Sequence, residues 1–331
     1  MPQAYSPALD GIRALAALTV AVYHAHLPGL TGGFFGVDVF FVLSGYLITR
    51  LLLCEKASTG GLQFDRFIIR RARRLVPALL LMLLAYLLVA PWLFPDVAFA
   101  KHVRDAFLSA TYMVNYATVL GAPVAVLGNV WSLAVEMQFY LLWPLLLLAL
   151  LRLPRSMAMG LIFVLYVLVT ALRWWSSEHF SLWGFYTRTE THSSGLLLGC
   201  LLGYSGMTIH RYWAAVGLLL LFFTMSFFST MWMPTVRYGF TLTEVGAALL
   251  ILAQPAWLGA APLAWLGRMS YGFYLWHYPI MRIVRGREGW EWPAVMMLGV
   301  GLGLLFAVLS HYLVERRFYQ PRFSETRNTL A

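Results

Sequence analysis

Ten long apolar segments dominate this sequence and restrict what it can fold into. Most approach the length of about 20 residues that a helix needs to cross the hydrocarbon core of a membrane. Hydrophobic residues make up 60% of the 331 residues and charged residues only 11%, which is more apolar sequence than a water-soluble domain needs. The pattern predicts an all-α, polytopic membrane helical bundle with about ten transmembrane helices. The segments are residues 9–28, 35–54, 75–94, 131–151, 157–175, 193–206, 213–229, 240–258, 263–284 and 293–314.

The rest of the chain gives no sign of a second domain. Residues 96–130 are mixed in character and predict a loop with one helix lying at the membrane interface. We find no low-complexity linker and no internal repeat, so a single integral membrane domain is expected over residues 1–331, without a separate soluble domain. Cys54 and Cys200 fall in or beside apolar segments, which favours neither a disulfide framework nor a metal site.

The positive charge of this chain lies mainly in short loops between the apolar segments. A net charge of +10 is compatible with nucleic-acid binding, but this distribution is instead the one by which membrane proteins orient themselves. The loop 55–74, counted with alternate loops, predicts that its side is cytoplasmic and that both termini lie there. That loop carries Lys56, Arg66, Arg70, Arg71, Arg73 and Arg74.

The first apolar segment carries an arginine and a histidine on one face. In "LDGIRALAALTVAVYHAH", Arg13 and His24 are 11 residues apart, which is about three helical turns and about 16 Å along the axis. Asp10 lies three residues before Arg13, where the two side chains can pair. An ionisable residue inside a membrane is a functional candidate. The alternative is an orienting arginine at the cytoplasmic end and a packed interfacial histidine at the other.

Asp38 is an unusual carboxylate near the start of the second apolar segment, in "GGFFGVDVFFVLSGYLITR". A short turn separates it from His24, so both residues are expected in the same extracytoplasmic third of the protein. A carboxylate that faces an imidazole fixes its tautomer and raises its basicity. Asp38 is therefore predicted either to orient His24 or to cap the second helix.

A second carboxylate, Glu136, lies one to two turns inside the fourth apolar segment, in "NVWSLAVEMQFYLLWPLL". That segment is predicted to run inward from the extracytoplasmic face, which places Glu136 at a depth similar to that of His24 and Asp38. An acid at this position in an apolar helix is costly. It is either functional or a hydrogen-bonded group that fixes helix packing.

The stretch "RFIIRRARRLVPALL" places four arginines before the third apolar segment, with spacings of three and four residues that create one basic face. They act either as positive-inside anchors or as a phosphate clamp, because guanidinium groups bind phosphate in a bidentate manner. The four are Arg70, Arg71, Arg73 and Arg74.

Two further stretches complete the pattern. Gly195, Gly199 and Gly203 form a stripe of small residues that predicts close helix packing. The stretch "LGRMSYGFYLWHYPI" contains His277 among aromatic residues typical of a helix core or membrane belt. The sequence does not decide the roles of His192, His277 and Glu315.

Together these motifs resemble the acyltransferase-3 family of integral membrane O-acyltransferases. The resemblance rests on four stretches that occur in order between residues 9 and 280. The C-terminal "VERRFYQP" departs from the pattern often found in the family and leaves the role of Glu315 open. The four are "LDGIRALAALTVAVYHAH", "FFGVDVFFVLSGYLITRLL", "RRARRLVP" followed by "WSLAVEMQFYLLWP", and "SYGFYLWHYPI".

The resemblance implies an acyl-CoA donor, acetyl-CoA by default, that arrives from the cytoplasm. It also implies an acceptor hydroxyl on a sugar or glycosylated small molecule, and a location in the bacterial inner membrane. Arg13 and His24 match the family's essential pair, and residues 70–74 match its basic motif on the CoA side. No metal is expected, and the oligomeric state is not indicated.

The resulting hypothesis is a site with two ends. The arginines hold the CoA phosphates at the cytoplasmic face, and His24, oriented by Asp38, acts as general base on the acceptor hydroxyl. Glu136 is either a second proton acceptor or a partner that positions Arg13 or His24, and an acyl-histidine intermediate is an open alternative. The competing class is a transporter or flippase that uses the same residues as relays. Inverted repeats would favour that class, and none is detected.

Overall fold

The computed structural model describes residues 6–230, 232–286 and 290–318. Within these ranges the chain forms helices and loops and no β-strand. Six helical segments are long and apolar enough to cross a membrane, and the shorter apolar helices Ser194–Ser205 and Trp213–Phe227 accompany them. The predicted all-α membrane bundle is therefore confirmed, whereas the number of spans stays a prediction.

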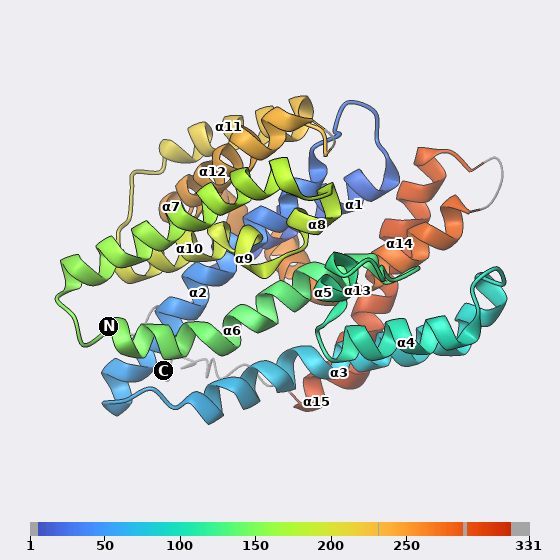
Figure 1. Ribbon diagram of the computed structural model, residues 1–331, viewed down its shortest axis with the longest axis horizontal. Helices are drawn as coiled ribbons and strands as arrows, with labels where there is room; N and C mark the ends of the chain where they lie inside the picture. The colour runs from blue at the N-terminus through green and yellow to red at the C-terminus, as the bar shows by residue number, and fades with distance from the viewer. Residues whose placement is uncertain (1–5, 231, 287–289, 319–331) are drawn as a thin grey trace, which may run out of the picture.

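The first half of the bundle contains one large departure from the predicted segments. The helix that holds the third apolar segment begins at Phe64, so the four arginines lie on a helix rather than in a loop. Residues 96–130 form two short helices instead of one, and α4 packs along α3 (Figure 1). The helices are α1 (Pro7–Ala25), α2 (Gly36–Thr59), α3 (Phe64–Leu93), α4 (Phe99–Ala110), α5 (Val114–Val119), α6 (Trp131–Leu150), α7 (Arg155–His179) and α8 (Leu182–Tyr186).

The second half follows the predicted segments closely. The ninth apolar segment, although interrupted by polar residues, lies in one continuous helix, α13, and short turns of 3-10 or π-helix connect or extend several elements. The helices are α9 (Thr189–His192), α10 (Ser194–Ser205), α11 (Trp213–Phe227), α12 (Phe240–Ala253), α13 (Ala261–Arg285), α14 (Trp292–Ser310) and α15 (Arg316–Phe318). The turns are η1 (Gly33–Phe35), η2 (Gly128–Val130), η3 (Thr235–Gly239), η4 (Ala256–Gly259) and η5 (His311–Glu315).

Two tightly packed helix pairs form the centre of the bundle. α1 packs against α13, and α2 packs against α10. The glycines permit this approach, because a Cβ atom at Gly267 would clash with the carbonyl oxygen of Asp10 and one at Gly199 with that of Val42. The predicted small-residue stripe of α10 thus serves close packing. α1 also contacts α2, and the helices α1, α2 and α13 all contribute to the cavities described below.

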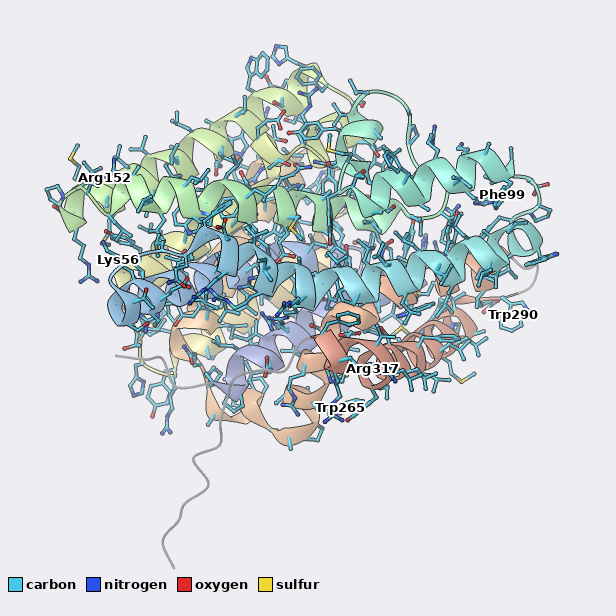
Figure 2. The ribbon with its side chains drawn as sticks, turned by 90° about the horizontal axis from the view of Figure 1, so that it is seen from below. Lys56, Phe99, Arg152, Trp265, Trp290 and Arg317 are labelled. Atoms are coloured by element: carbon cyan, nitrogen blue, oxygen red, sulfur yellow. The ribbon has the colours of Figure 1, made fainter. Side chains whose placement is uncertain are left out.

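Two of the stretches predicted to be cytoplasmic lie at one end of the bundle (Figure 2). Lys56 and Arg152, from two loops expected on the cytoplasmic side, lie at one end of the long axis, whereas Phe99 and Trp290 lie at the other (Figure 2). Several outward-facing helices expose large apolar side chains, such as Leu168 on α7. A surface of this kind suits contact with lipid.

Candidate active site

Two cavities meet inside the bundle, and their linings share Val37 of α2 and Tyr274 of α13. The one that contains His24, which we call the histidine cavity, has an empty volume of about 480 Å³. The one that contains Arg13, which we call the arginine cavity, has an empty volume of about 610 Å³. The sequence predicted one site with two ends; the structure contains two chambers with a common wall.

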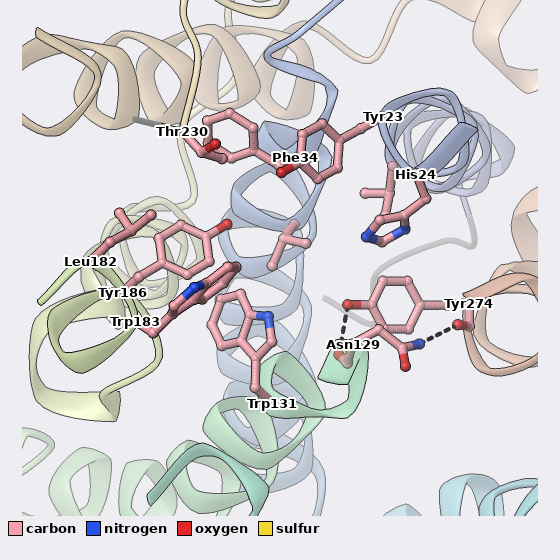
Figure 3. A pocket seen from close by; sticks show the side chains of 12 residues that line it. Tyr23, His24, Phe34, Asn129, Trp131, Leu182, Trp183, Tyr186, Thr230 and Tyr274 are labelled. Atoms are coloured by element: carbon pink, nitrogen blue, oxygen red, sulfur yellow. Dashed lines mark hydrogen bonds between the residues drawn. The ribbon is translucent and has the colours of Figure 1, made fainter. Parts of the chain in front are cut away.

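The histidine cavity is mostly aromatic. Tyr23 and Phe34 form one side, and Trp131, Trp183 and Tyr186 form the opposite side (Figure 3). Flat aromatic faces and few polar groups are typical of a small-molecule pocket that orients its ligand through a few hydrogen bonds. The complete lining is Val20, Tyr23, His24, Phe34, Val37, Asn129, Trp131, Leu182, Trp183, Tyr186, Thr230 and Tyr274.

His24 lies near the C-terminal end of α1, and its imidazole extends into the histidine cavity (Figure 3). Its Nδ1 atom is 3.0 Å from Nε2 of His277 on α13. His277 is fully buried, and its Nδ1 atom is 3.0 Å from the backbone carbonyl oxygen of Phe273. The partner of His24 is thus a second histidine, 253 positions away in the chain.

The predicted contact between Asp38 and His24 is wrong. Asp38 is buried, and its Oδ1 atom is 3.0 Å from Nε2 of His192, while Nδ1 of His192 is 2.6 Å from the carbonyl oxygen of Tyr186. Nor does Asp38 cap a helix, because the N-cap of α2 is Phe35. The packing of α2 on α10 brings Asp38 toward His192 at the α9–α10 junction. A short turn in the sequence did not determine which face of α2 points at α1.

His192 itself is enclosed by protein side chains. It is 1% exposed, and the rings of Phe41, Trp131, Tyr186 and Phe240 surround it at centroid distances of 4.7–5.6 Å. It contributes to the lining of neither chamber. The Asp38–His192 pair therefore joins α2 to α10 inside the protein.

A second buried polar group lies close by and was not predicted. Arg173 of α7 and Glu244 of α12 form an ion pair of 3.5 Å, and both side chains are almost fully buried. Ser194 donates to Glu244 at 2.5 Å, and Tyr166 donates to its other oxygen at 3.0 Å. The sequence shows one charged residue in each of two apolar segments, but it does not indicate that the two residues pair. These contacts tie α7, α10 and α12 together.

The arginine cavity collects positive charge from two helices. Arg13 of α1 and Arg71 and Arg74 of α3 line it, and a carboxylate oxygen of Asp10 lies 3.8 Å from Arg13. The guanidinium of Arg71 also lies 5.0 Å from the ring centre of Tyr140, a cation–π distance. The full lining is Arg13, Val37, Phe40, Phe41, Ser44, Arg71, Arg74, Leu75, Ser132, Leu133, Glu136, Tyr140, Ser270, Tyr271 and Tyr274.

Glu136, predicted at a depth similar to that of His24 and as a partner of either Arg13 or His24, lines the arginine cavity and not the histidine cavity. Ser44 and Tyr140 donate hydrogen bonds to its Oε1 atom, the latter at 2.5 Å. Glu136 therefore supplies the negative charge that faces the three arginines. The depth of Glu136 along α6 did not reveal which chamber its side chain would enter.

The four arginines of residues 70–74 divide into two pairs. Arg71 and Arg74 face the cavity. Arg70 is exposed and forms an ion pair of 3.0 Å with Glu55, and Arg73 is also exposed. Helical geometry separates the pairs, because residues three apart lie on one face of a helix and their immediate neighbours do not.

Tyr274 lies at the junction of the two cavities and is held in place by neighbouring groups. Its hydroxyl is 2.7 Å from Oγ of Ser132 and 3.0 Å from the carbonyl oxygen of Asn129. The side chain of Asn129 donates in turn to the carbonyl oxygen of Tyr274 at 2.9 Å (Figure 3). These bonds connect η2 and the start of α6 to α13 and fix the wall between the chambers.

Metal-ligand clusters and disulfide bonds are both absent from the described residues. Within the described ranges, no group of three or more His, Cys, Asp or Glu side chains is arranged to hold a metal ion. Cys54 and Cys200 are not joined in a disulfide bond. The two cavities with the shared lining residues Val37 and Tyr274 are therefore taken as the candidate site.

The fold and these cavities define a helical integral membrane protein with a basic chamber and a histidine chamber that share a wall. Residues 6–312 match the Acyl_transf_3 family, described as an acyltransferase domain. The chain belongs to this acyltransferase-3 family, as its motifs predicted.

Relatives from two bacteria support this assignment. The peptidoglycan O-acetyltransferase OatA of Listeria monocytogenes is 33% identical over 94% of this chain and 55% of its own length. The O-acetyltransferase OatA of Staphylococcus aureus is 31% identical over 94% of this chain and 57% of its own length. The chain thus spans about half the length of the curated relatives it matches. No solved structure matches it.

Proposed function

We propose that this protein is a membrane O-acyltransferase that moves an acetyl group from a CoA thioester to a hydroxyl of a carbohydrate. The observation that carries this proposal is the pair of cavities with a common wall at Val37 and Tyr274. A basic chamber suits a phosphorylated donor, and a chamber with a histidine suits activation of a hydroxyl. Membership of the acyltransferase-3 family and the relatives named as O-acetyltransferases support the same reaction class.

The donor binds in the arginine cavity, which includes Arg71 and Arg74 from the stretch predicted to lie on the cytoplasmic side. Arg13, Arg71 and Arg74 hold the CoA phosphates, because charge-assisted bonds from guanidinium to phosphate are short and directional. Glu136 balances the arginine charges when the donor is absent and keeps their side chains apart. Arg70 and Arg73 lie outside the lining and anchor α3 at the membrane surface.

Transfer takes place where the two chambers meet. The thioester reaches the wall at Tyr274, and the acceptor hydroxyl approaches from the histidine cavity. His24 removes the hydroxyl proton, the oxygen attacks the carbonyl carbon, the C–S bond breaks, and the proton passes from His24 to the departing thiolate. CoA leaves as a free thiol and His24 is neutral again. The catalytic cycle therefore needs no reactant other than the donor and the acceptor.

The acceptor is a carbohydrate because aromatic side chains line the histidine cavity on two sides. Trp131, Trp183 and Tyr186 offer flat apolar faces to a sugar ring, and His24 faces the hydroxyls at its edge. The relative named as a peptidoglycan O-acetyltransferase makes peptidoglycan fragments the first acceptors to test.

Release of CoA by the purified protein tests this function. The protein is reconstituted in liposomes with acetyl-CoA, and free thiol is measured with and without soluble peptidoglycan fragments. We expect acceptor-dependent thiol release and an equal amount of acetyl ester on the glycan by mass spectrometry. A transporter or flippase, the competing class, would release no thiol. Thiol release that does not depend on any glycan would contradict a carbohydrate acceptor.

A further inference from the structure

We propose that His277, not Asp38, is the positioning residue of His24, and that it holds His24 in the tautomer whose Nε2 atom carries the lone pair. The proposal rests on the chain of contacts from His24 through His277 to the backbone of α13. Its consequence for catalysis rests on the proposed function, whereas the tautomer itself does not.

The backbone carbonyl of Phe273 fixes which atom donates in each hydrogen bond from His277 to His24. The carbonyl oxygen of Phe273 can only accept a hydrogen bond, so Nδ1 of His277, 3.0 Å away, must carry the proton and donate it. In a neutral imidazole the other nitrogen is then the acceptor. Nε2 of His277 therefore accepts from Nδ1 of His24 across their 3.0 Å contact.

The same rule applied to His24 leaves its Nε2 atom without a proton. Among the residues that the structure describes, no hydrogen bond to this atom is found, and the side chain of His24 lines the histidine cavity (Figure 3). The free lone pair is thus available to a ligand in the histidine cavity. If His24 had the opposite tautomer, two acceptor nitrogens would face each other at 3.0 Å, which is unfavourable.

A carboxylate often fixes the tautomer and orientation of a catalytic histidine. Here the uncharged imidazole of His277 does so for His24. His277 is fully buried, and its position is set by the α13 backbone four residues earlier. When Nε2 of His24 takes the acceptor proton, Nδ1 continues to donate to His277. The ring keeps its orientation through the whole proton cycle.

Nitrogen-15 NMR of the wild-type protein tests the tautomer directly. The chain has eight histidines, and the signals of His24 and His277 are assigned by their loss in His24→Ala and His277→Ala. In reconstituted protein labelled at histidine and held at a pH where both rings are neutral, we expect Nε2 of His24 and Nε2 of His277 to show the shift of an unprotonated nitrogen. A protonated Nε2 on His24 would overturn the proposal, whatever the enzymatic activity.

Kinetics of two variants separate positioning from simple packing. His277→Ala removes the acceptor, and we expect kcat to fall about 100-fold with the KM for acetyl-CoA unchanged. His277→Gln supplies a carbonyl oxygen near the position of Nε2, and we expect it to restore kcat to within about tenfold of wild type. Equal kcat values in the two variants, with both proteins folded, would overturn the positioning role. If wild type itself transfers no acetyl group, the proposed function fails while the NMR result still decides the tautomer.

Discussion

His24 and His192 each contact a buried polar side chain, but the two histidines differ in their access to a cavity. His192 has a carboxylate and a carbonyl oxygen as partners, so both ring nitrogens are occupied inside a shell of aromatic rings. His24 has one nitrogen on His277 and the other on the edge of a cavity. The pair that resembles a catalytic dyad, Asp38–His192, is closed to ligands, and the pair without a carboxylate is open.

Under the proposed function, the chemistry depends on an unoccupied histidine nitrogen beside a cavity more than on the identity of the partner of that histidine. In His192, a carboxylate holds one ring nitrogen and a backbone carbonyl oxygen contacts the other, so the whole ring can be buried. The four predictions below test or sharpen this contrast, beginning with the largest expected effect.

Removal of the open histidine is expected to have the largest effect on transfer. In His24→Ala the general base is lost, so we expect kcat to fall about 1,000-fold, within the usual range for such groups. Acetyl-CoA binding should persist because the arginine cavity is untouched. Thiol release by purified, folded variant checks this prediction, and substantial remaining transfer would remove His24 from the mechanism.

Removal of one member of the closed pair should act on stability instead. His192→Ala leaves Asp38 buried and unpaired, so we expect the free energy of unfolding to drop by about 3 kcal/mol. The double variant Asp38→Leu with His192→Leu should recover part of this loss, because neither polar group is then left without its partner. Thermal unfolding in detergent measures the stability, and transfer per folded molecule should stay near wild type. A folded but inactive His192→Ala protein would contradict the distinction between the pairs.

The arginines allow the same comparison on neighbouring residues of one helix. Arg71→Ala and Arg74→Ala each remove a charge from the cavity lining, and we expect the KM for acetyl-CoA to rise about tenfold, as for one charged hydrogen bond. Arg73→Ala is the matched control because Arg73 is exposed and outside the lining. Steady-state kinetics with varied donor concentration provide the measurement. A control variant as impaired as Arg71→Ala would show that α3 acts through total charge.

A change at Tyr274, which lines both cavities, is expected to have the smallest effect on kcat. Tyr274→Phe keeps the ring but removes the hydroxyl that contacts Ser132 and Asn129, which costs about 1 kcal/mol. We expect kcat to fall only a few-fold if these bonds hold the wall in place. Turnover and thermal stability of the variant are measured together. A loss as large as that of His24→Ala would mean that the phenol takes part in the chemistry.

The sequence predicted the helical segments, the Asp10–Arg13 pair and the close packing at the α10 glycines, because these depend on local periodicity and spacing. The family match likewise followed from ordered motifs. His24 and Arg13 were recognised as ionisable residues on one face of the first helix, and each lines one of the two cavities.

The partners of these residues depended on tertiary packing and could not be predicted. His24 meets His277 across 253 positions, and Asp38 meets His192 across 154. The orientation of α2 about its own axis decides which of its faces meets α1 and which meets α10. No local pattern in "FFGVDVFFVLSGYLITR" contains that angle, so Asp38 was assigned to the nearer histidine in the sequence. The division of Arg70–Arg74 into two faces was implicit in helical spacing, but the structure was needed to show which face lines a cavity.

The central claim is that donor binding and hydroxyl activation occupy separate chambers. Equilibrium binding of acetyl-CoA and single-turnover transfer, measured on the same preparations of His24→Ala and of the double variant Arg71→Ala with Arg74→Ala, test it most directly. The account predicts normal donor affinity without transfer for the first variant. For the second it predicts weakened affinity, with a transfer rate near wild type once the donor is saturating. Loss of donor affinity in His24→Ala would contradict the account and place both functions in a single chamber.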